Sequence, residues 1–455
     1  MAQRLKERPL WLRNPLAVLV SDGVDADGGV LIVDAKIVEL VPAGQKPTAM
    51  LDSAYDVFDA SEHVILPGLI NTHHHMYQTL TRAHPAAINK ELFPWLQALY
   101  PLWARLTPEG LRAATELAMV ELMMSGVTTT SDHQYVFPPG LEDALDIQAD
   151  VAASLGMRIV LNRGSMNLSQ KDGGLPPDSV VQTHDQIMAD SERVISKFHC
   201  TDEGAMAQVA LAPCSPFSVT PELMKDTSQL ALKCGCGLHT HLGETHDEDT
   251  FCEATFGMRP VDYLESVGWL GSSTWLAHGV HFNDDEVMRL GKAGVGVCHC
   301  PTSNMVLASG HCRTREMEAA GVKIGLGVDG SASNDSSNLM EGVRHALMIN
   351  RLTYDATVTH LDALRWATEG SAACLNRSDL GQIAVGKQAD LALFKLDELR
   401  FSGAHDPLAA LVLCGAHCAD RVMIAGKWKL VDGQPLGIDV EQLQAEHAAA
   451  ARVFA

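Results

Sequence analysis

Short hydrophobic runs alternate with longer stretches of helical spacing through the middle of the chain. Eight of the runs have the length of buried strands and are bounded by turn residues. Strand–helix alternation repeated eight times predicts a parallel sheet, and eight units predict closure into a (β/α)8 TIM-like barrel. The predicted strands are 65–71, 127–132, 158–162, 209–213, 237–242, 274–277, 295–300 and 323–328.

The stretches between these runs carry helix signals. Thr107 and Thr220 are each followed by proline and glutamate, which is typical of a capping residue, a first helical position and an acidic first turn. Gly126, Gly156 and Gly294 are placed where helices would end. These signals favour α/β architecture over an all-β one.

Both ends of the chain have a different pattern. Residues 1–66 and 381–455 contain short alternating runs with glycine and aspartate turns, typical of antiparallel strands. We therefore predict two domains, a small β-sandwich formed by both termini and a (β/α)8 barrel at 67–380. A helix over 440–453 is expected to close the chain.

Composition narrows the function. The 455 residues carry a net charge of -22, which opposes binding to nucleic acid or to an acidic membrane surface. No hydrophobic run approaches the length of a membrane-spanning helix. Eleven scattered cysteines, an odd number, fit reduced thiols better than a disulfide framework, so a cytoplasmic protein is expected.

Candidate chemistry begins at the end of the first predicted strand, in the sequence His73-His74-His75. Side chains alternate along an extended chain, so His73 and His75 point one way and His74 the other. A pair of imidazoles at a strand end is half of a metal site. The competing interpretation is a polar loop with unrelated histidines.

Other strand ends supply further groups. The fifth ends in His239 and His241 with Glu244 close behind, the sixth in His278 and the eighth in Asp329. Because active sites of such barrels lie at the carboxyl ends of the strands, these groups are expected to meet. Nitrogen ligands with a carboxylate suit Zn²⁺, and other divalent metals bind similar sets. Alternation alone does not choose between His239 and His241.

The same motifs resemble the amidohydrolase superfamily, in its cytosine/guanine/chlorotriazine deaminase-like branch, and the resemblance covers nearly the whole chain. It rests on His73-His-His75, His241-Leu-Gly-Glu244, Ala-His278, Gly-Val-Asp329-Gly-Ser and the 381–391 segment. Gln78-Thr-Leu-Thr-Arg82, Leu92-Phe-Pro-Trp95-Leu and Asp329-Gly-Ser-Ala-Ser-Asn334-Asp335 are most similar to deaminases of 8-oxoguanine.

The resemblance implies a site. His73, His75, His241 and Asp329 become metal ligands, and Glu244, His278 and Asp329 become catalytic groups. It implies one Zn²⁺ per subunit, with Fe²⁺ or Mn²⁺ as alternatives, and a homo-oligomer. Asp329 would take a proton from the attacking water, and Glu244 would protonate the ring and the leaving ammonia.

The expected reaction is hydrolytic deamination of a purine-like heterocycle, with 8-oxoguanine giving urate and ammonia. Guanine, isoxanthopterin or cytosine deamination and triazine hydrolysis remain alternatives within the branch. A non-enzymatic barrel scaffold is a further alternative, although it predicts loss of the ligands or of Glu244, and all are present.

Substrate-binding candidates are Gln78, Trp95 and Arg163. Gln78 lies three residues past His75, where an amide can bond both donor and acceptor edges of a purine. Trp95 offers a flat ring for stacking, and Arg163 follows the third strand. A surface glutamine, a buried aromatic and a surface ion pair are the respective structural alternatives.

Overall fold

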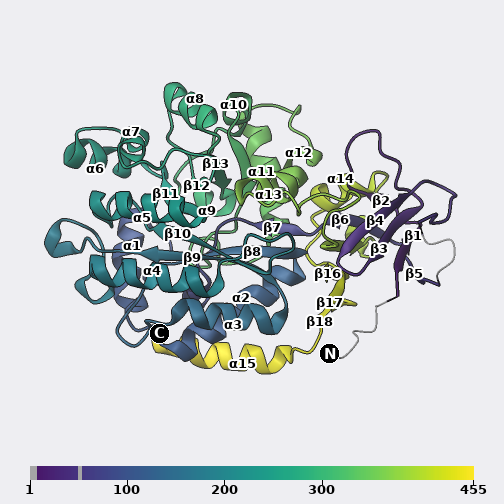
Figure 1. The fold of residues 1–455 in the computed structure, drawn as a ribbon, viewed down its shortest axis with the longest axis horizontal. Helices are drawn as coiled ribbons and strands as arrows, with labels where there is room; N and C mark the ends of the chain where they lie inside the picture. The colour runs from purple at the N-terminus through teal and green to yellow at the C-terminus, as the bar shows by residue number, and fades with distance from the viewer. Residues whose placement is uncertain (1–7, 50–53) are drawn as a thin grey trace.

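The computed structural model describes residues 8–49 and 54–455 of the chain, so the first seven residues of the predicted terminal domain lie outside the described part. Eight parallel strands form one sheet in which neighbours follow chain order (Figure 1). The ends meet because the Thr72 N–H donates to the Leu326 carbonyl at 3.0 Å. The predicted barrel is therefore confirmed, with strands β7 (Leu69–Asn71), β8 (Val127–Gln134), β9 (Arg158–Ser165), β10 (Ala207–Pro213), β11 (Gly237–Leu242), β12 (Thr274–His278), β13 (Gly296–His299) and β14 (Lys323–Leu326).

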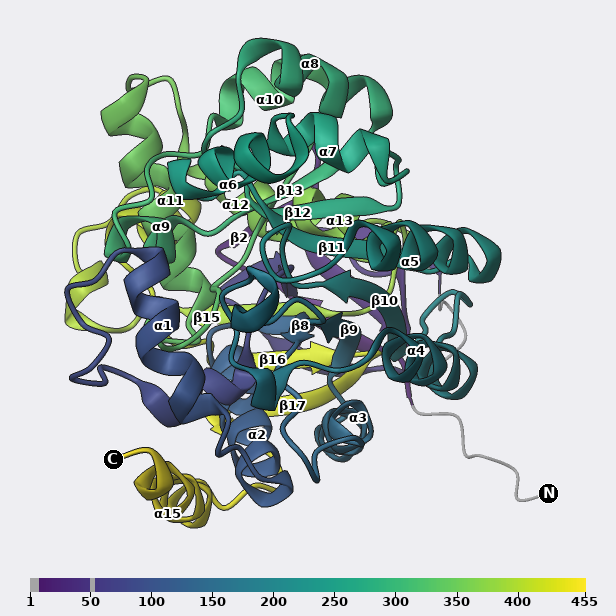
Figure 2. The same ribbon diagram turned by 90° about the vertical axis from the view of Figure 1, so that its left-hand side faces the viewer.

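Helices surround this sheet (Figure 2). Thr107 and Thr220 each accept a hydrogen bond from a backbone N–H in the first turn of their helix, as expected, and Gly156 and Gly294 end theirs in the left-handed conformation. The helices are α2 (Pro108–Met124), α3 (Ala144–Leu155), α4 (His184–Phe198), α5 (Pro221–Cys234), α6 (His246–Phe256), α7 (Pro260–Ser266), α8 (Asp284–Ala293), α9 (Pro301–Val306), α10 (Thr314–Ala320), α11 (Leu339–Thr353), α12 (His360–Arg365) and α13 (Ser371–Cys374).

Two further sheets lie beside the barrel, on the right of Figure 1. One has the order β4-β3-β1-β5, and the other the order β18-β17-β16-β15-β6-β2. The second joins strands from both ends of the chain, as predicted, while the domain boundaries themselves stay a prediction. The strands are β1 (Leu10–Arg13), β2 (Ala17–Val18), β3 (Gly29–Val33), β4 (Lys36–Val41), β5 (Asp56–Asp59), β6 (His63–Pro67), β15 (Leu391–Lys395), β16 (Arg421–Ile424), β17 (Lys427–Val431) and β18 (Gln434–Pro435).

The predicted strand 65–71 is two strands. β6 pairs antiparallel with β15 in the six-stranded sheet, and β7 pairs parallel with β8 in the barrel. Gly68 stands between them, where an added Cβ would lie 2.2 Å from the Thr128 side chain. A residue without a side chain lets the chain pass between the two sheets at this point.

Two longer helices lie outside the eight strand–helix units. The segment between β7 and α2 contains helix α1 (Leu92–Trp103), with Pro101 inside it. The terminal helix α15 (Val440–Ala451) packs on α2 of the barrel, along the lower edge of Figure 1. Shorter elements are α14 (Pro407–Leu413), the 3-10 helices η1 (Met76–Thr81), η2 (Gln170–Asp172), η3 (Asp178–Val180), η5 (Leu399–Phe401) and η6 (Arg452–Phe454), and the π-helix η4 (Trp366–Gly370).

Within the described residues, every helix is too short or too polar to span a membrane. All eleven cysteines are free thiols, in keeping with the expectation from the sequence.

Candidate active site

The histidines after β7 lie as alternation predicts. The rings of His73 and His75 are neighbours, with centroids 4.6 Å apart. His74 turns the other way, and its Nε2 lies 3.0 Å from the Ser337 hydroxyl. All three are buried. The strand end therefore presents two imidazoles to one side.

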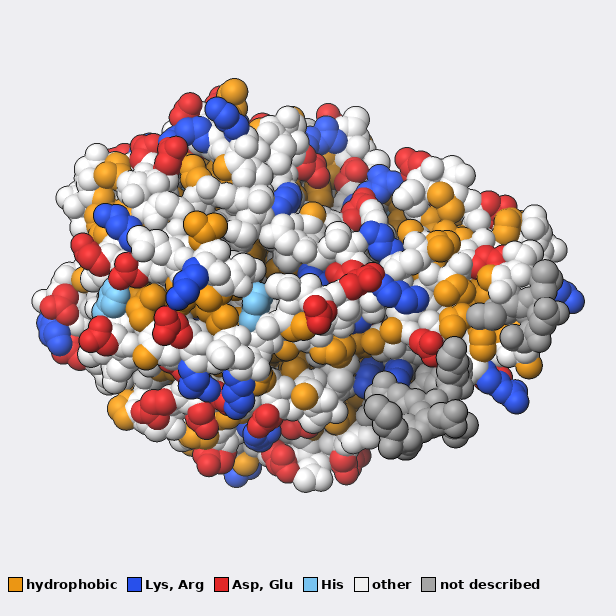
Figure 3. Space-filling model, viewed as in Figure 1, with side chains coloured by type: hydrophobic (Ala, Val, Ile, Leu, Met, Phe, Trp, Pro, Cys, Tyr) orange, Lys and Arg blue, Asp and Glu red, His pale blue; other side chains and the backbone are white. Residues whose placement is uncertain are grey.

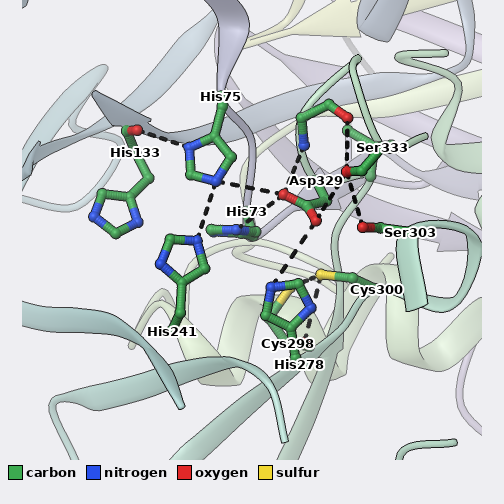
Figure 4. Close-up of polar contacts among 12 residues, drawn as sticks. His73, His75, His133, His241, His278, Cys298, Cys300, Ser303, Asp329 and Ser333 are labelled. Atoms are coloured by element: carbon green, nitrogen blue, oxygen red, sulfur yellow. Dashed lines mark hydrogen bonds and ion pairs between the residues drawn. The ribbon is translucent and has the colours of Figure 1, made fainter. Parts of the chain in front are cut away.

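His241 at the end of β11 and Asp329 after β14 complete a cluster with this pair (Figure 4). His75 Nε2 lies 3.1 Å from His241 Nε2 and 3.4 Å from Asp329 Oδ1. His73 Nε2 lies 3.3 Å from the same carboxylate oxygen. Four candidate ligand atoms from three strand ends thus converge on one point.

These separations fit ligand atoms that share one metal ion. Zinc–nitrogen and zinc–oxygen bonds of about 2.0–2.1 Å place neighbouring ligand atoms about 3.3 Å apart. The three separations of 3.1, 3.3 and 3.4 Å agree with that value. His73 Nε2 is buried with no hydrogen-bond partner among the described residues, as expected of a nitrogen whose lone pair binds a metal. The residues present therefore fit a divalent ion.

Main-chain carbonyls orient two of the three imidazoles. His75 Nδ1 donates to the His133 carbonyl at 2.8 Å, and His241 Nδ1 donates to the Cys214 carbonyl at 2.6 Å. A neutral imidazole has one N–H, so Nε2 of each ring keeps its lone pair for a metal. His73 Nδ1 faces His239 Nε2 at 2.8 Å.

Glu244 and His278 lie beside the cluster. His278 Nε2 is 3.4 Å from Glu244 Oε2 and 3.9 Å from Asp329 Oδ2, and its Nδ1 donates to Asn304 Oδ1 at 2.9 Å. Burial raises the pKa of Glu244 to about 7, against the opposing effect of His278. For His278, burial disfavours the charged ring, but the two carboxylates outweigh it and raise its pKa. The arrangement can hold and release protons near neutral pH.

A cavity opens onto this cluster. Its walls are mainly aromatic and aliphatic, as in small-molecule sites. One wall is the inner face of α1, which contributes Leu92, Trp95, Leu96 and Tyr100. The other lining residues are His75, Gln78, Tyr135, Cys214, Phe217, His241, Glu244, His278, Leu307, Asp329 and Ser333.

Of the three substrate-binding candidates, the structure brings two to the cavity. Gln78 lines it with a side-chain oxygen that has no partner in the described part of the chain, and Trp95 lines it while its indole N–H donates to the Ala332 carbonyl at 3.0 Å. Arg163 is not among the lining residues. Its guanidinium pairs with Asp190 at 2.6 Å and stacks on Phe137. Arg163 thus forms an ion pair, but a buried one and not the surface pair of the structural alternative.

Sequence reasoning left out several lining groups. Tyr135 and Cys214 follow β8 and β10, and their positions just past strands were the available signal. Two further residues were candidates from the sequence and do not line the cavity. His133, just past the second predicted strand, has a buried Nδ1 without a partner among the described residues, and its ring stacks on His241 with centroids 4.9 Å apart. Asn304, beside the end of the seventh predicted strand, lies in α9 and orients His278.

Comparison with known proteins agrees with this geometry. The amidohydrolase family profile matches residues 64–429. The chain is 60% identical over 442 residues to the 8-oxoguanine deaminase of Pseudomonas aeruginosa, covering 97% of this chain and 98% of that protein. It is 34% identical to an isoxanthopterin deaminase from an unknown prokaryotic organism, over 86% and 85% of the two chains. The crystal structure of atrazine chlorohydrolase from Arthrobacter aurescens TC1 in complex with zinc superposes with a TM-score of 0.90 at 28% identity, over 97% of this chain and all of the other.

The chain belongs to the amidohydrolase family. It is a hydrolytic enzyme of the group that deaminates heterocycles, and its cluster of histidines and a carboxylate is suited to a metal cofactor. The predicted enzyme class is thereby confirmed, and the alternative of a scaffold without catalysis is wrong.

Proposed function

We propose that the protein is a zinc-dependent deaminase that converts 8-oxoguanine to urate and ammonia. One observation carries the proposal: Gln78, whose amide oxygen has no partner among the described residues, and a protonatable carboxyl, Glu244, share one cavity with three of the four candidate metal ligands. The high identity to a deaminase of that substrate over nearly the full length supports the choice.

His73, His75, His241 and Asp329 would hold the metal. Zinc is the proposed ion because the donor set is three imidazoles and one carboxylate at separations that suit ligands of one ion. When bound, such an ion lowers the pKa of water towards about 7. Fe²⁺ and Mn²⁺ accept similar ligands, so metal analysis of the purified protein is needed to identify the ion.

The chain's own residues would move the protons. Asp329 accepts a proton from the water that attacks the ring carbon bearing the amine. Glu244, with its pKa raised to about 7 by burial, donates its proton to the neighbouring ring nitrogen. The proton held by Asp329 then passes through Glu244 to the departing amine, and the hydroxyl on the tetrahedral carbon gives its proton to Glu244, so both carboxyl groups end as they began. Water and the aminated ring thus become ammonia and a ring carbonyl. His278, held by Asn304, stabilises the oxygen at the tetrahedral carbon.

The cavity walls would select a flat, aminated ring. Gln78 offers a donor and an acceptor to the polar edge of the heterocycle, and Trp95 on α1 covers its face. A contact between Arg163 and substrate stays a prediction, and the partners of its guanidinium do not favour it.

We further propose a cytoplasmic location and a homo-oligomeric assembly. The free cysteines suit a reducing compartment, and the assembly is suggested by the family resemblance. On the face in Figure 3 acidic and basic side chains are interspersed. With a net charge of -22, this favours a small-molecule substrate over a nucleic acid.

An ammonia-release assay tests the substrate. Zinc-loaded protein is given 8-oxoguanine, guanine, isoxanthopterin, cytosine and an aminotriazine at equal concentrations, and urate formation is followed by absorbance. We expect the highest kcat/KM with 8-oxoguanine and equal amounts of urate and ammonia. Fast turnover of another compound with none of 8-oxoguanine would reject the substrate and keep the enzyme class.

A further inference from the structure

His239 is a buried histidine without a role in the chemistry described above. It lies on the same face of β11 as His241, two residues earlier, but does not line the cavity. Its Nε2 instead lies 2.8 Å from Nδ1 of His73, on the side of that ring away from the candidate metal position. The question is what this contact does to His73.

The Trp275 carbonyl determines which nitrogen of His239 carries the proton. His239 Nδ1 lies 2.8 Å from the Trp275 carbonyl, which only accepts hydrogen bonds. The proton of His239 is therefore on Nδ1, and its Nε2 is an acceptor. His73 must then carry its own proton on Nδ1, which leaves its Nε2 with a free lone pair. A second proton on His239 would be a buried charge and would force the His73 proton onto Nε2.

Trp275 holds both ends of this arrangement. Its ring stacks on His239 with centroids 4.6 Å apart and planes 17° from parallel. Its indole N–H donates to the Thr72 carbonyl at 3.1 Å, immediately before His73. His239 and Trp275 are also direct partners in the β11–β12 register. The ring of His239 is thus fixed in position relative to His73.

His73 differs from the other two candidate imidazole ligands in this respect. His75 and His241 donate to main-chain carbonyls, which no substitution removes. The acceptor for His73 is a side chain, and a side chain can be replaced. We propose that His239 is a positioning residue that sets the tautomer and ring angle of His73 and so raises the affinity of the site for a divalent metal. This inference rests on the metal site of the proposed function.

Two substitutions test the role. His239→Phe keeps an aromatic ring to stack on Trp275 but removes the acceptor, and His239→Gln offers an amide oxygen as a replacement acceptor. The zinc dissociation constant is measured by competition with a chromophoric chelator, and the melting temperature is measured on metal-free protein. His405→Phe, at an exposed position ahead of α14, is the matched control.

We expect His239→Phe to bind zinc about 10–100-fold more weakly, the usual cost of losing a hydrogen-bond partner behind a metal ligand. His239→Gln should recover part of that loss, and every variant should stay folded without metal at the temperature of the titration. Unchanged zinc affinity in His239→Phe would overturn the role, as would an equal loss in His239→Gln. Wild-type protein that binds no zinc would overturn the proposed function as a whole.

Discussion

Two residues at the centre of the site have a backbone conformation that L-residues rarely adopt. His278 and Asp329 have φ angles of 74° and 62°. Such a conformation costs about 1–3 kcal/mol and persists where the surroundings impose it. The Asp329 N–H donates to the His73 carbonyl at 3.1 Å, which ties the carboxylate to the neighbouring strand end. Strain at these two positions is consistent with the catalytic roles proposed for them.

Glu244 gives the first prediction at this scale. Glu244→Gln should keep its zinc content but lose about 10²–10⁴-fold in kcat, because an amide cannot deliver the proton. Turnover and metal content are measured on the same preparation. Near-normal turnover in the variant would refute the proton transfer assigned to Glu244.

Gln78 gives the second. Its side-chain oxygen has no partner among the described residues, so Gln78→Leu should chiefly weaken substrate binding and raise KM about 10-fold. Gln170→Leu, an exposed position in η2, is the control and should behave like wild type. An unchanged KM for Gln78→Leu would remove Gln78 from the binding site.

At the scale of elements, the first turn of α6 supports the loop that carries Glu244. Glu248 is buried, and one of its oxygens accepts the Gly243 N–H at 2.5 Å. The other oxygen has no partner within the described part of the chain. Burial raises the pKa of this carboxyl well above its usual value, and the neighbouring Glu244 adds to the effect. Glu248 therefore holds the loop best in its protonated form.

The pH dependence of stability tests this view. A carboxyl whose pKa is higher in the folded state contributes stability that is complete below about pH 4.5 and is lost as pH rises towards the folded pKa. Glu248→Gln keeps an acceptor for Gly243 and removes the ionisation. The melting temperature of Glu248→Gln minus that of wild type should therefore increase from pH 5 to pH 8. Glu253→Gln, at an exposed position, is the control. A constant difference across that range would contradict the assignment.

Most of the fold and part of the candidate site could be predicted from the sequence patterns of single elements. Eight apolar runs and the residues at their ends were enough to predict the barrel and the residues that cluster at its mouth. Gly68 hid the change of sheet, because the residues on both sides of it are equally apolar. Helix α1 was hard to predict because Pro101 lies inside it, and proline is rare in the interior of a helix. Arg163 lies inside β9, which runs to Ser165 and not only to the predicted end at residue 162. Its guanidinium pairs with Asp190 of α4, a partner that no local pattern specifies.

At the scale of the whole molecule, a buried ion pair joins the barrel to the six-stranded sheet. Arg158 at the start of β9 lies 2.7 Å from Asp390, which immediately precedes β15, and both side chains are buried. Asp390 also accepts the Ala425 N–H at 2.7 Å. The contact links the part of the chain that carries the site to the part formed by both termini.

Replacing Arg158 should destabilise the folded protein. Arg158→Met leaves a buried carboxylate unpaired and should lower the free energy of unfolding by about 3–5 kcal/mol. Arg13→Met breaks the exposed pair with Asp59 and should cost about 0–1 kcal/mol. Denaturant titration of both variants measures the difference. Equal losses would show that the Arg158 pair does not stabilise the contact between the sheets.

The central claim is that His73, His75, His241 and Asp329 surround one metal ion. Anomalous diffraction at the zinc absorption edge, on crystals of zinc-loaded protein, tests it most directly. We predict a single peak about 2.0–2.1 Å from the three Nε2 atoms and from one Asp329 oxygen. A zinc-loaded crystal with no peak among these four side chains, or with the ion held elsewhere, would contradict the account.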